Sequence, residues 1–206
     1  MKKLVFSALV GCGLLATQSL ASEKSVYVGI DYLNNSNTIE YSDKTEEVDN
    51  NSKAFKFKIG FADNDNNLRT QLYFLSETYD EPIFDSSNDN LKEIGMDIIK
   101  TLPLTPKFLP FIQAGFGYGF MSIDGYNESS IAEVSFKVGV GAIYKITPKF
   151  ELLGGLDFQY RKWQDREVTT TYKYTGVYYN YYSSTTETIE TDETSSKLYV
   201  GLNLHF

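Results

Sequence analysis

The 206-residue chain has one cysteine, one histidine and one tryptophan, and these scarcities limit its chemistry. A single cysteine, Cys12, cannot form a disulfide within the chain. The only histidine, His205, is the next-to-last residue, so no predicted long loop offers a histidine for nucleophilic catalysis or zinc binding. We therefore expect no enzymatic activity, no metal site and no cofactor.

Long apolar runs are also missing. A basic pair precedes the apolar stretch Leu4–Leu15, and small residues follow it. This pattern predicts an export signal peptide over residues 1–21 and one mature domain over residues 22–206. The apolar stretch is too short to cross a bilayer as a helix. The competing interpretation of this stretch is a lipoprotein processing site that ends at Cys12.

Basic residues are fewer than acidic ones, and the net charge of −8 disfavours a nucleic-acid partner. Four polar stretches, residues 34–52, 80–90, 122–131 and 164–196, together carry a net charge of −14. The simplest interpretation is a solvated acidic surface. A sharper one is weak bridging by divalent cations to anionic lipopolysaccharide.

Tyrosine and phenylalanine are abundant, with 16 and 14 copies, and the final segment shows how they are used. In Lys197–Phe206, polar or small residues alternate with an apolar row: Leu198, Val200, Leu202, Leu204 and Phe206. A period of two with one apolar row predicts a β-strand with one dry face and one wet face.

Seven other segments show the same alternation. The predicted strands are Ser25–Leu33, Lys53–Ala62, Leu68–Tyr79, Leu91–Lys100, Phe108–Met121, Ala132–Tyr144, Phe150–Trp163 and Lys197–Phe206. Long and short connections alternate between them, which predicts an up-and-down meander. The fold expected is all-β: an eight-stranded antiparallel barrel.

The apolar face of this barrel can point outward to lipid or inward to a ligand, as in a soluble carrier. Lipid is favoured because the apolar rows are nearly free of polar groups over the length that a tilted strand needs to cross a bilayer. Aromatic residues near both strand ends suggest two girdles. The other face carries both charge signs, which we expect to pair inside a transmembrane barrel. This interior network comprises Lys56, Lys58, Arg69, Glu93, Asp97, Lys137, Glu151, Asp157, Arg161 and Lys197, with Asp31 and Glu77.

A family resemblance rests on four features: the export signal, the eight strands, the alternating connections and the final strand that ends in Phe206. The chain resembles small bacterial outer-membrane barrels of the OmpA and OmpX type, the outer membrane protein beta-barrel domain family. The resemblance implies an outer-membrane location, with short turns in the periplasm and long loops outside. It also implies three partners: outer-membrane lipid, lipopolysaccharide and the barrel-assembly machinery. The row Leu198, Val200, Leu202, Leu204 and Phe206 resembles the signal that this machinery reads.

The last long connection is rich in threonine and tyrosine, which favour strands. We predict that it forms a hairpin above the membrane, turning near Tyr179–Ser184. Its candidate contact residues are Tyr172, Tyr174, Tyr178, Tyr179, Tyr181 and Tyr182. The function expected is structural or adhesin-like, through contact with a host or cell-surface partner. The alternative is a small porin, although eight strands leave room only for side chains. A lipid-modifying enzyme is the third and least favoured interpretation.

Replacing Phe206 with alanine should prevent assembly, because it removes the aromatic end of the proposed assembly signal. The measurement is the amount of heat-modifiable barrel in the outer-membrane fraction. Phe150→Ala, which removes an aromatic residue at the same end of another strand, is the control. Equal folded yields of the two variants would contradict the assembly signal.

Overall fold

The computed structural model describes residues 24–44, 47–84, 90–123, 130–175 and 180–206. The barrel strands are β1 (Lys24–Tyr41), β2 (Val48–Asp63), β3 (Leu68–Tyr79), β4 (Asn90–Thr101), β5 (Phe108–Ser122), β6 (Ser130–Lys145), β7 (Phe150–Trp163) and β10 (Thr191–His205). The strands β8 (Arg166–Thr175) and β9 (Asn180–Ile189) form a separate hairpin. The predicted signal peptide, residues 1–21, lies outside the described residues.

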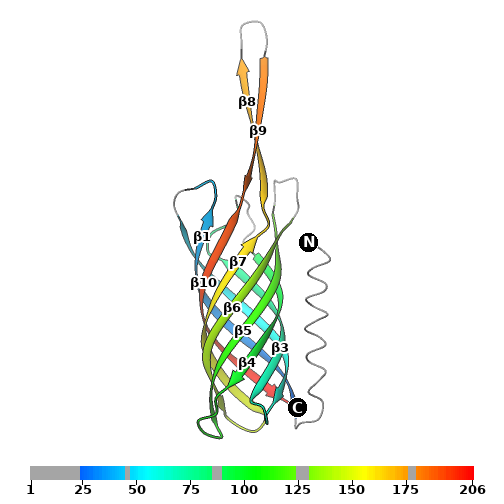
Figure 1. The fold of residues 1–206 in the computed structure, drawn as a ribbon, viewed down its shortest axis with the longest axis vertical. Helices are drawn as coiled ribbons and strands as arrows, with labels where there is room; N and C mark the ends of the chain where they lie inside the picture. The colour runs from blue at the N-terminus through cyan, green and yellow to red at the C-terminus, as the bar shows by residue number, and fades with distance from the viewer. Residues whose placement is uncertain (1–23, 45–46, 85–89, 124–129, 176–179) are drawn as a thin grey trace.

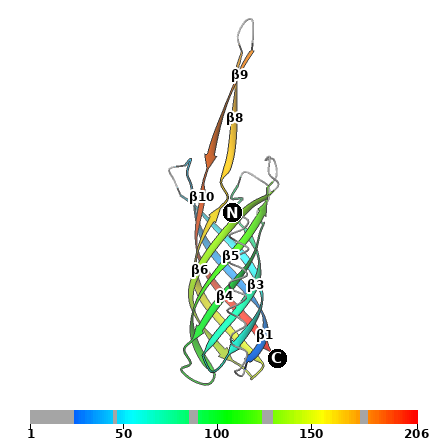
Figure 2. The same ribbon diagram turned by 45° about the vertical axis from the view of Figure 1, so that its right-hand side comes forward.

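The eight barrel strands form one closed antiparallel sheet in the order β1-β10-β7-β6-β5-β4-β3-β2. The predicted all-β, up-and-down, eight-stranded barrel is thereby confirmed. The β8–β9 hairpin continues beyond one end of the barrel, along its long axis, in both views (Figure 1, Figure 2). We call this the loop end, and the opposite end, with the short connections, the turn end. In the described part of the chain, no helix is long and apolar enough to cross a membrane.

Three strands, β1, β2 and β10, extend well beyond their predicted bounds. β1 continues to Tyr41 and β2 begins at Val48, so residues 34–41 and 48–52 are strand and not the predicted loop. β10 begins at Thr191, in the stretch that we predict as part of the hairpin. The extended part of β1 pairs with β10 from Asn34↔Leu198 to Tyr41↔Thr191. The prediction was wrong here because the outward side chains are polar once a strand leaves the apolar belt. The alternation of inward Ile39 with outward Glu40 nevertheless persists.

The apolar rows face outward, as expected for contact with lipid. Phe136 and Val138 on β6 are 62% and 60% exposed, although both are large hydrophobic residues. Exposed aromatic side chains occur near both ends of the belt. At the turn end these are Phe61, Phe108, Tyr144, Phe150 and Phe206, and toward the loop end Tyr32, Phe120 and Tyr160. A continuous apolar belt of this kind is stable only against a bilayer.

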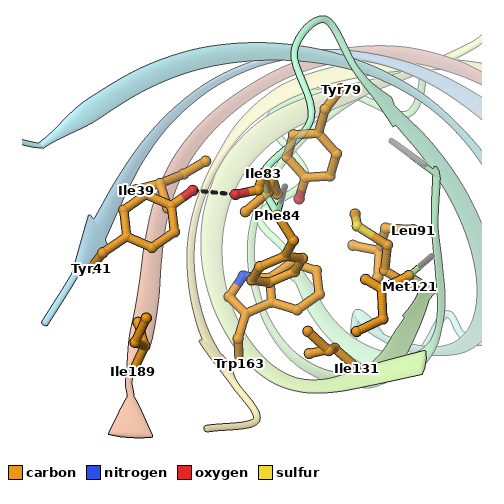
Figure 3. Packing of buried hydrophobic residues seen from close by; sticks show 11 residues of the cluster. Ile39, Tyr41, Tyr79, Ile83, Phe84, Leu91, Met121, Ile131, Trp163 and Ile189 are labelled. Atoms are coloured by element: carbon orange, nitrogen blue, oxygen red, sulfur yellow. Dashed lines mark hydrogen bonds between the residues drawn. The ribbon is translucent and has the colours of Figure 1, made fainter. Parts of the chain in front are cut away.

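Apolar side chains pack together at the loop end of the barrel, in a cluster that the sequence did not reveal and that we call the plug (Figure 3). Phe84 and Trp163 pack edge to face, with ring centroids 5.2 Å apart. The Tyr41 hydroxyl donates a hydrogen bond to the Ile83 backbone oxygen at 2.5 Å. The plug consists of Ile39, Tyr41, Tyr79, Ile83, Phe84, Leu91, Met121, Ile123, Ile131, Trp163 and Ile189. The long β1 contributes Ile39 and Tyr41, and the end of β9 contributes Ile189, so the barrel has a hydrophobic core above the ionic interior.

A second apolar cluster lies inside the barrel toward the turn end. It contains Leu33, Ala54, Tyr73, Leu75, Ile99, Leu109, Phe111, Ile143, Leu153 and Tyr199. Its packing depends on a missing side chain at Gly141. A Cβ atom there would lie 2.5 Å from the Gly154 backbone oxygen and 2.5 Å from the Phe111 ring. Gly154 has more space, since the nearest atom to its added Cβ would be the Tyr199 backbone oxygen at 3.3 Å.

The Gly141→Ala variant should therefore be less stable, by about 1–3 kcal/mol, because the added methyl group overpacks the interior. Gly154→Ala, on the neighbouring strand, is the matched control and should change stability by less than about 1 kcal/mol. Urea midpoints of the purified proteins in detergent, followed by gel mobility, measure both. Equal midpoints would show that the interior adapts to the extra atom.

Candidate functional site

Arg161 on β7 is the centre of the interior charge network. Its guanidinium is fully buried and lies 2.6 Å from Glu77, 2.8 Å from Glu193 and 3.1 Å from Glu93. It also donates a hydrogen bond to the Tyr79 hydroxyl at 2.7 Å. The planar guanidinium presents several donors at once, which explains why one arginine can join carboxylates from three strands, β3, β4 and β10.

A second group of charges lies around Asp97 on β4. The Lys137 ammonium is 2.8 Å from Asp97 and 4.0 Å from the centre of the Tyr73 ring. The Lys56 ammonium is 3.3 Å from Asp31 and 3.9 Å from Asp97. Both lysines thus contact an anion, and the ion pairs offset the free-energy cost of burying the charges.

The third group is at the turn end and joins the strands that close the barrel. Arg69 on β3 donates two hydrogen bonds to Glu151 on β7, at 2.6 and 3.0 Å. His205 Nε2 on β10 is 2.9 Å from Glu151, and His205 Nδ1 is 3.1 Å from the Ser25 hydroxyl on β1. Serine, histidine and glutamate are also the groups of a nucleophilic relay. Here Arg69 also engages both oxygens of Glu151, and these contacts join β1, β3, β7 and β10.

The structure places all ten predicted network residues inside the barrel, along with Asp31 and Glu77. Lys197 lies 3.2 Å from Glu77, and Lys58 pairs with Asp31. Asp157 differs from the others, because it accepts a hydrogen bond from the Gln113 side chain where we had expected an ion pair. The network is therefore mixed, with amide and hydroxyl donors among the cations.

Two buried carboxylates, Glu133 and Glu193, were missed. Both are fully buried. Glu193 was assigned to a loop, where it was counted as surface charge, and it instead contacts Arg161. Glu133 has the same parity as Lys137 on β6, which could have identified it. Outside the turns, the barrel interior contains eight buried carboxylates and six buried lysines or arginines. The carboxylates are Asp31, Glu77, Glu93, Asp97, Glu133, Glu151, Asp157 and Glu193, and the cations are Lys56, Lys58, Arg69, Lys137, Arg161 and Lys197.

Side chains fill the middle of the barrel. The cavity between Lys56, Arg69, Gln113 and Tyr199 has a volume of about 10 Å³, which is close to the smallest space that holds one water molecule. The apolar plug lies above it at the loop end. This cavity is too small for a hydrated ion.

The hairpin at the loop end pairs from Arg166↔Ile189 to Thr175↔Asn180. The predicted hairpin is present, but the predicted turn is wrong, because Asn180–Ser184 belong to β9 and the chain reverses before Asn180. Of the candidate contact residues, Tyr172 and Tyr174 lie on β8 and Tyr181 and Tyr182 on β9. Tyr178 and Tyr179 lie outside the described residues.

The base of the hairpin is anchored to the plug. Ile189 is buried among the plug residues, and the Arg166 guanidinium lies 4.6 Å from the centre of the Phe84 ring. The Ser42 backbone also donates a hydrogen bond to the Glu190 backbone oxygen at 3.0 Å, which ties the base to the end of β1. The hairpin therefore starts from a fixed point. Within the described ranges, no three histidine, cysteine or acidic side chains gather as a metal site would require.

Comparison with known proteins agrees with this architecture. The family model of the outer membrane protein beta-barrel domain matches residues 5–206. Neisserial surface protein A has a similar solved structure, with a TM-score of 0.58 and 19% sequence identity over 90% of this chain and 100% of that chain. Outer membrane protein H from P. aeruginosa has a TM-score of 0.51 and 13% identity, over 88% of this chain and 99% of that chain. No curated protein matches the sequence significantly.

Replacing Arg161 with methionine should destabilise the barrel by about 3–5 kcal/mol, because three buried carboxylates lose their shared cation. The adjacent Lys162 is the matched control. It also pairs with two carboxylates, Glu190 and Asp192, but its side chain is 37% exposed and points outward. Lys162→Met should cost less than about 1 kcal/mol. Urea titration of both variants in detergent is the measurement, and equal midpoints would contradict the central role of Arg161.

Proposed function

Because the chain belongs to the outer membrane protein beta-barrel domain family, we propose that it acts at the bacterial surface by contact through its β8–β9 hairpin. The chain is an outer-membrane β-barrel protein, and the family supports a location in the bacterial outer membrane. The hairpin is the structural feature that supports the contact role. It projects from the loop end as a two-stranded sheet outside the barrel (Figure 1).

The construction of the hairpin suits contact with a partner. A two-stranded sheet has an outer edge on each strand, and a peptide strand can add to such an edge by backbone hydrogen bonds. Threonine and tyrosine are frequent in both strands, and the ladder pairs Thr169 with Thr186, Thr170 with Thr185 and Tyr174 with Tyr181. Tyrosine combines an apolar ring with a hydrogen-bonding hydroxyl, which is useful on a surface that must be wet when free and dry when bound.

The rest of the barrel supports a structural role for the domain itself. Ion pairs and the plug fill its interior, so the barrel works as a rigid support for the loop end. No enzymatic role is proposed. The single histidine lies at the turn end, where Glu151 and Ser25 hold it, far along the barrel from the hairpin.

Three further partners follow from the family and from the described surface. The belt contacts membrane lipid, and the acidic loop end would approach the anionic lipopolysaccharide through divalent cations. The outward row of β10, from Leu198 to Phe206, is the part that the barrel-assembly machinery would read during insertion. The acidic balance of the chain gives no support to a nucleic-acid partner.

Replacing Thr170–Thr185 with Asn-Gly tests the proposal. These two residues face each other in the ladder, so a tight two-residue turn can join Thr169 to Thr186. We expect an intact heat-modifiable barrel, because the plug and the hairpin base remain. Non-adherent bacteria that express this variant should bind cultured epithelial cells and immobilised matrix proteins no better than cells without the protein.

The control for this experiment alters another connection at the same end. Replacing residues 124–129, between β5 and β6, with a glycine-serine linker should leave binding unchanged. If the hairpin variant still binds like the unaltered protein, the contact role of the hairpin fails. If neither the unaltered protein nor the variants bind, the surface-contact proposal itself fails.

Ion conductance distinguishes this proposal from a small porin. Because the described interior is filled, the purified barrel in planar bilayers should show no stepwise current over a broad voltage range. Regular current steps from the purified protein would contradict the filled interior and favour the porin.

A further inference from the structure

Two turns at the turn end repeat the same sequence and the same geometry. Leu104–Phe108 and Ile146–Phe150 both read as an aliphatic residue followed by Thr-Pro-Lys-Phe. In each turn the threonine hydroxyl accepts a hydrogen bond from the phenylalanine backbone, at 3.0 Å from both Phe108 and Phe150. The repeated turn therefore holds one aliphatic side chain, one lysine and one phenylalanine in a fixed order.

Backbone hydrogen bonds join these turns into a continuous rim. The Lys145 backbone donates to the Lys107 backbone oxygen at 2.8 Å, which connects the first turn to the strand before the second. The His205 backbone donates to the Lys149 backbone oxygen, also at 2.8 Å, which connects the second turn to β10. Lys107, Lys145 and Lys149 consequently lie on neighbouring strand ends. We call these three lysines, with Leu104 and Ile146, the basic rim.

The aliphatic residues of the basic rim are exposed where a water-facing turn would normally be polar. Leu104 is 71% exposed and Ile146 is 52% exposed. Both lie next to the turn-end aromatic girdle, where Phe206 is 75% exposed. The apolar surface thus continues from the lipid-facing belt onto the turns, which indicates that the bilayer surface reaches them.

Three acidic side chains of the described chain, Asp63, Asp65 and Glu151, lie at the same end as the rim lysines. Glu151, which faces Lys145 across the β6–β7 pair, is bound by Arg69 and lies beside His205. Asp63, at the end of β2, accepts hydrogen bonds from Asn66. Beside Phe206, the residues that line a surface hollow of about 200 Å³ include Ser25, Lys145, Lys149, Glu151 and His205. Ammonium groups, polar side chains and an exposed aromatic ring thus meet at one place.

We propose that the basic rim is a binding site for anionic phospholipids of the membrane leaflet at the turn end. Lys107, Lys145 and Lys149 bind the phosphate groups, and Leu104 and Ile146 lie among the first methylenes of the acyl chains. The charge distribution supports this assignment, since the loop end is acidic and would repel the same headgroups. The site is at the opposite end from the hairpin, so it does not depend on the proposed surface contact.

Native mass spectrometry of the detergent-solubilised barrel tests the site. With added phosphatidylglycerol, the unaltered protein should retain lipid adducts, and Lys107→Gln/Lys149→Gln should reduce their affinity by about five- to thirtyfold, at up to roughly 1 kcal/mol for each lysine near an anionic surface. Lys44→Gln/Lys173→Gln, which removes the same charge at the loop end, is the matched control and should leave the adducts in place. An equal loss in both variants, or no loss in either, would overturn the proposal.

Two further arms separate a lipid from a free anion. Phosphatidylcholine should bind less than phosphatidylglycerol, and soluble glycerol phosphate at the same concentration should not bind. Retention of glycerol phosphate would show an anion site that does not need the bilayer, which contradicts the proposal.

The apolar half of the site has its own measurement. In vesicles, the fluorescence of a Leu104→Trp variant should be quenched by lipids brominated near the headgroup end of the acyl chain. The native Trp163, buried in the plug, should be quenched much less. Equal quenching of the variant and the unaltered protein would show that this turn stays in water.

Discussion

The pairing of β1 with β10 is the interaction on which the rest of this structure depends. A sheet inside a bilayer cannot leave the backbone groups of an edge strand without hydrogen bonds, because there is no water to replace them. The ladder from Tyr27↔His205 to Tyr41↔Thr191 removes both edges at once. It is also longer than the membrane requires, and the additional pairs carry β1 and β10 up to the plug. The same long pairing therefore closes the barrel and positions the β1 residues of the plug, Ile39 and Tyr41.

Closure has a cost, since it forces every inward side chain into a narrow interior. Eight carboxylates and six lysines or arginines must then find partners across the barrel, and the carboxylates are in excess. Toward the loop end, the single guanidinium of Arg161 contacts carboxylates from three strands and so reduces the repulsion between them. At the turn end Arg69, Glu151 and His205 join β3, β7 and β10. The interior charges thus act as cross-links between strands, and this role explains why an eight-stranded barrel can be full without being apolar.

Along its long axis the molecule has three zones with different surroundings. The turn end carries lysines and exposed aliphatic residues, the belt carries apolar side chains, and the loop end carries acidic residues and the hairpin. Each zone suits a different contact: lipid headgroups, acyl chains and the exterior. The hairpin base packs on the plug through Ile189 and Arg166, so the start of the hairpin is fixed to the barrel.

The sequence by itself determined the period-two alternation, and with it the strand number, the antiparallel meander and the parity of each inward residue. These are local properties, because successive side chains of a strand always point to opposite faces. β3 and β7 were predicted with their observed bounds for this reason, and the inward parity of Glu133 can be read from the sequence.

Only the tertiary structure decided which inward residues become partners. Arg161 and Glu77 are 84 residues apart, and their contact follows from the stagger of strands around the closed barrel, which no single strand encodes. The strand extensions on β1 and β10, the burial of Glu193 and the plug are of the same kind. Outside the apolar belt both faces of a strand can be polar, so the pattern fades while the hydrogen-bonded pairing continues.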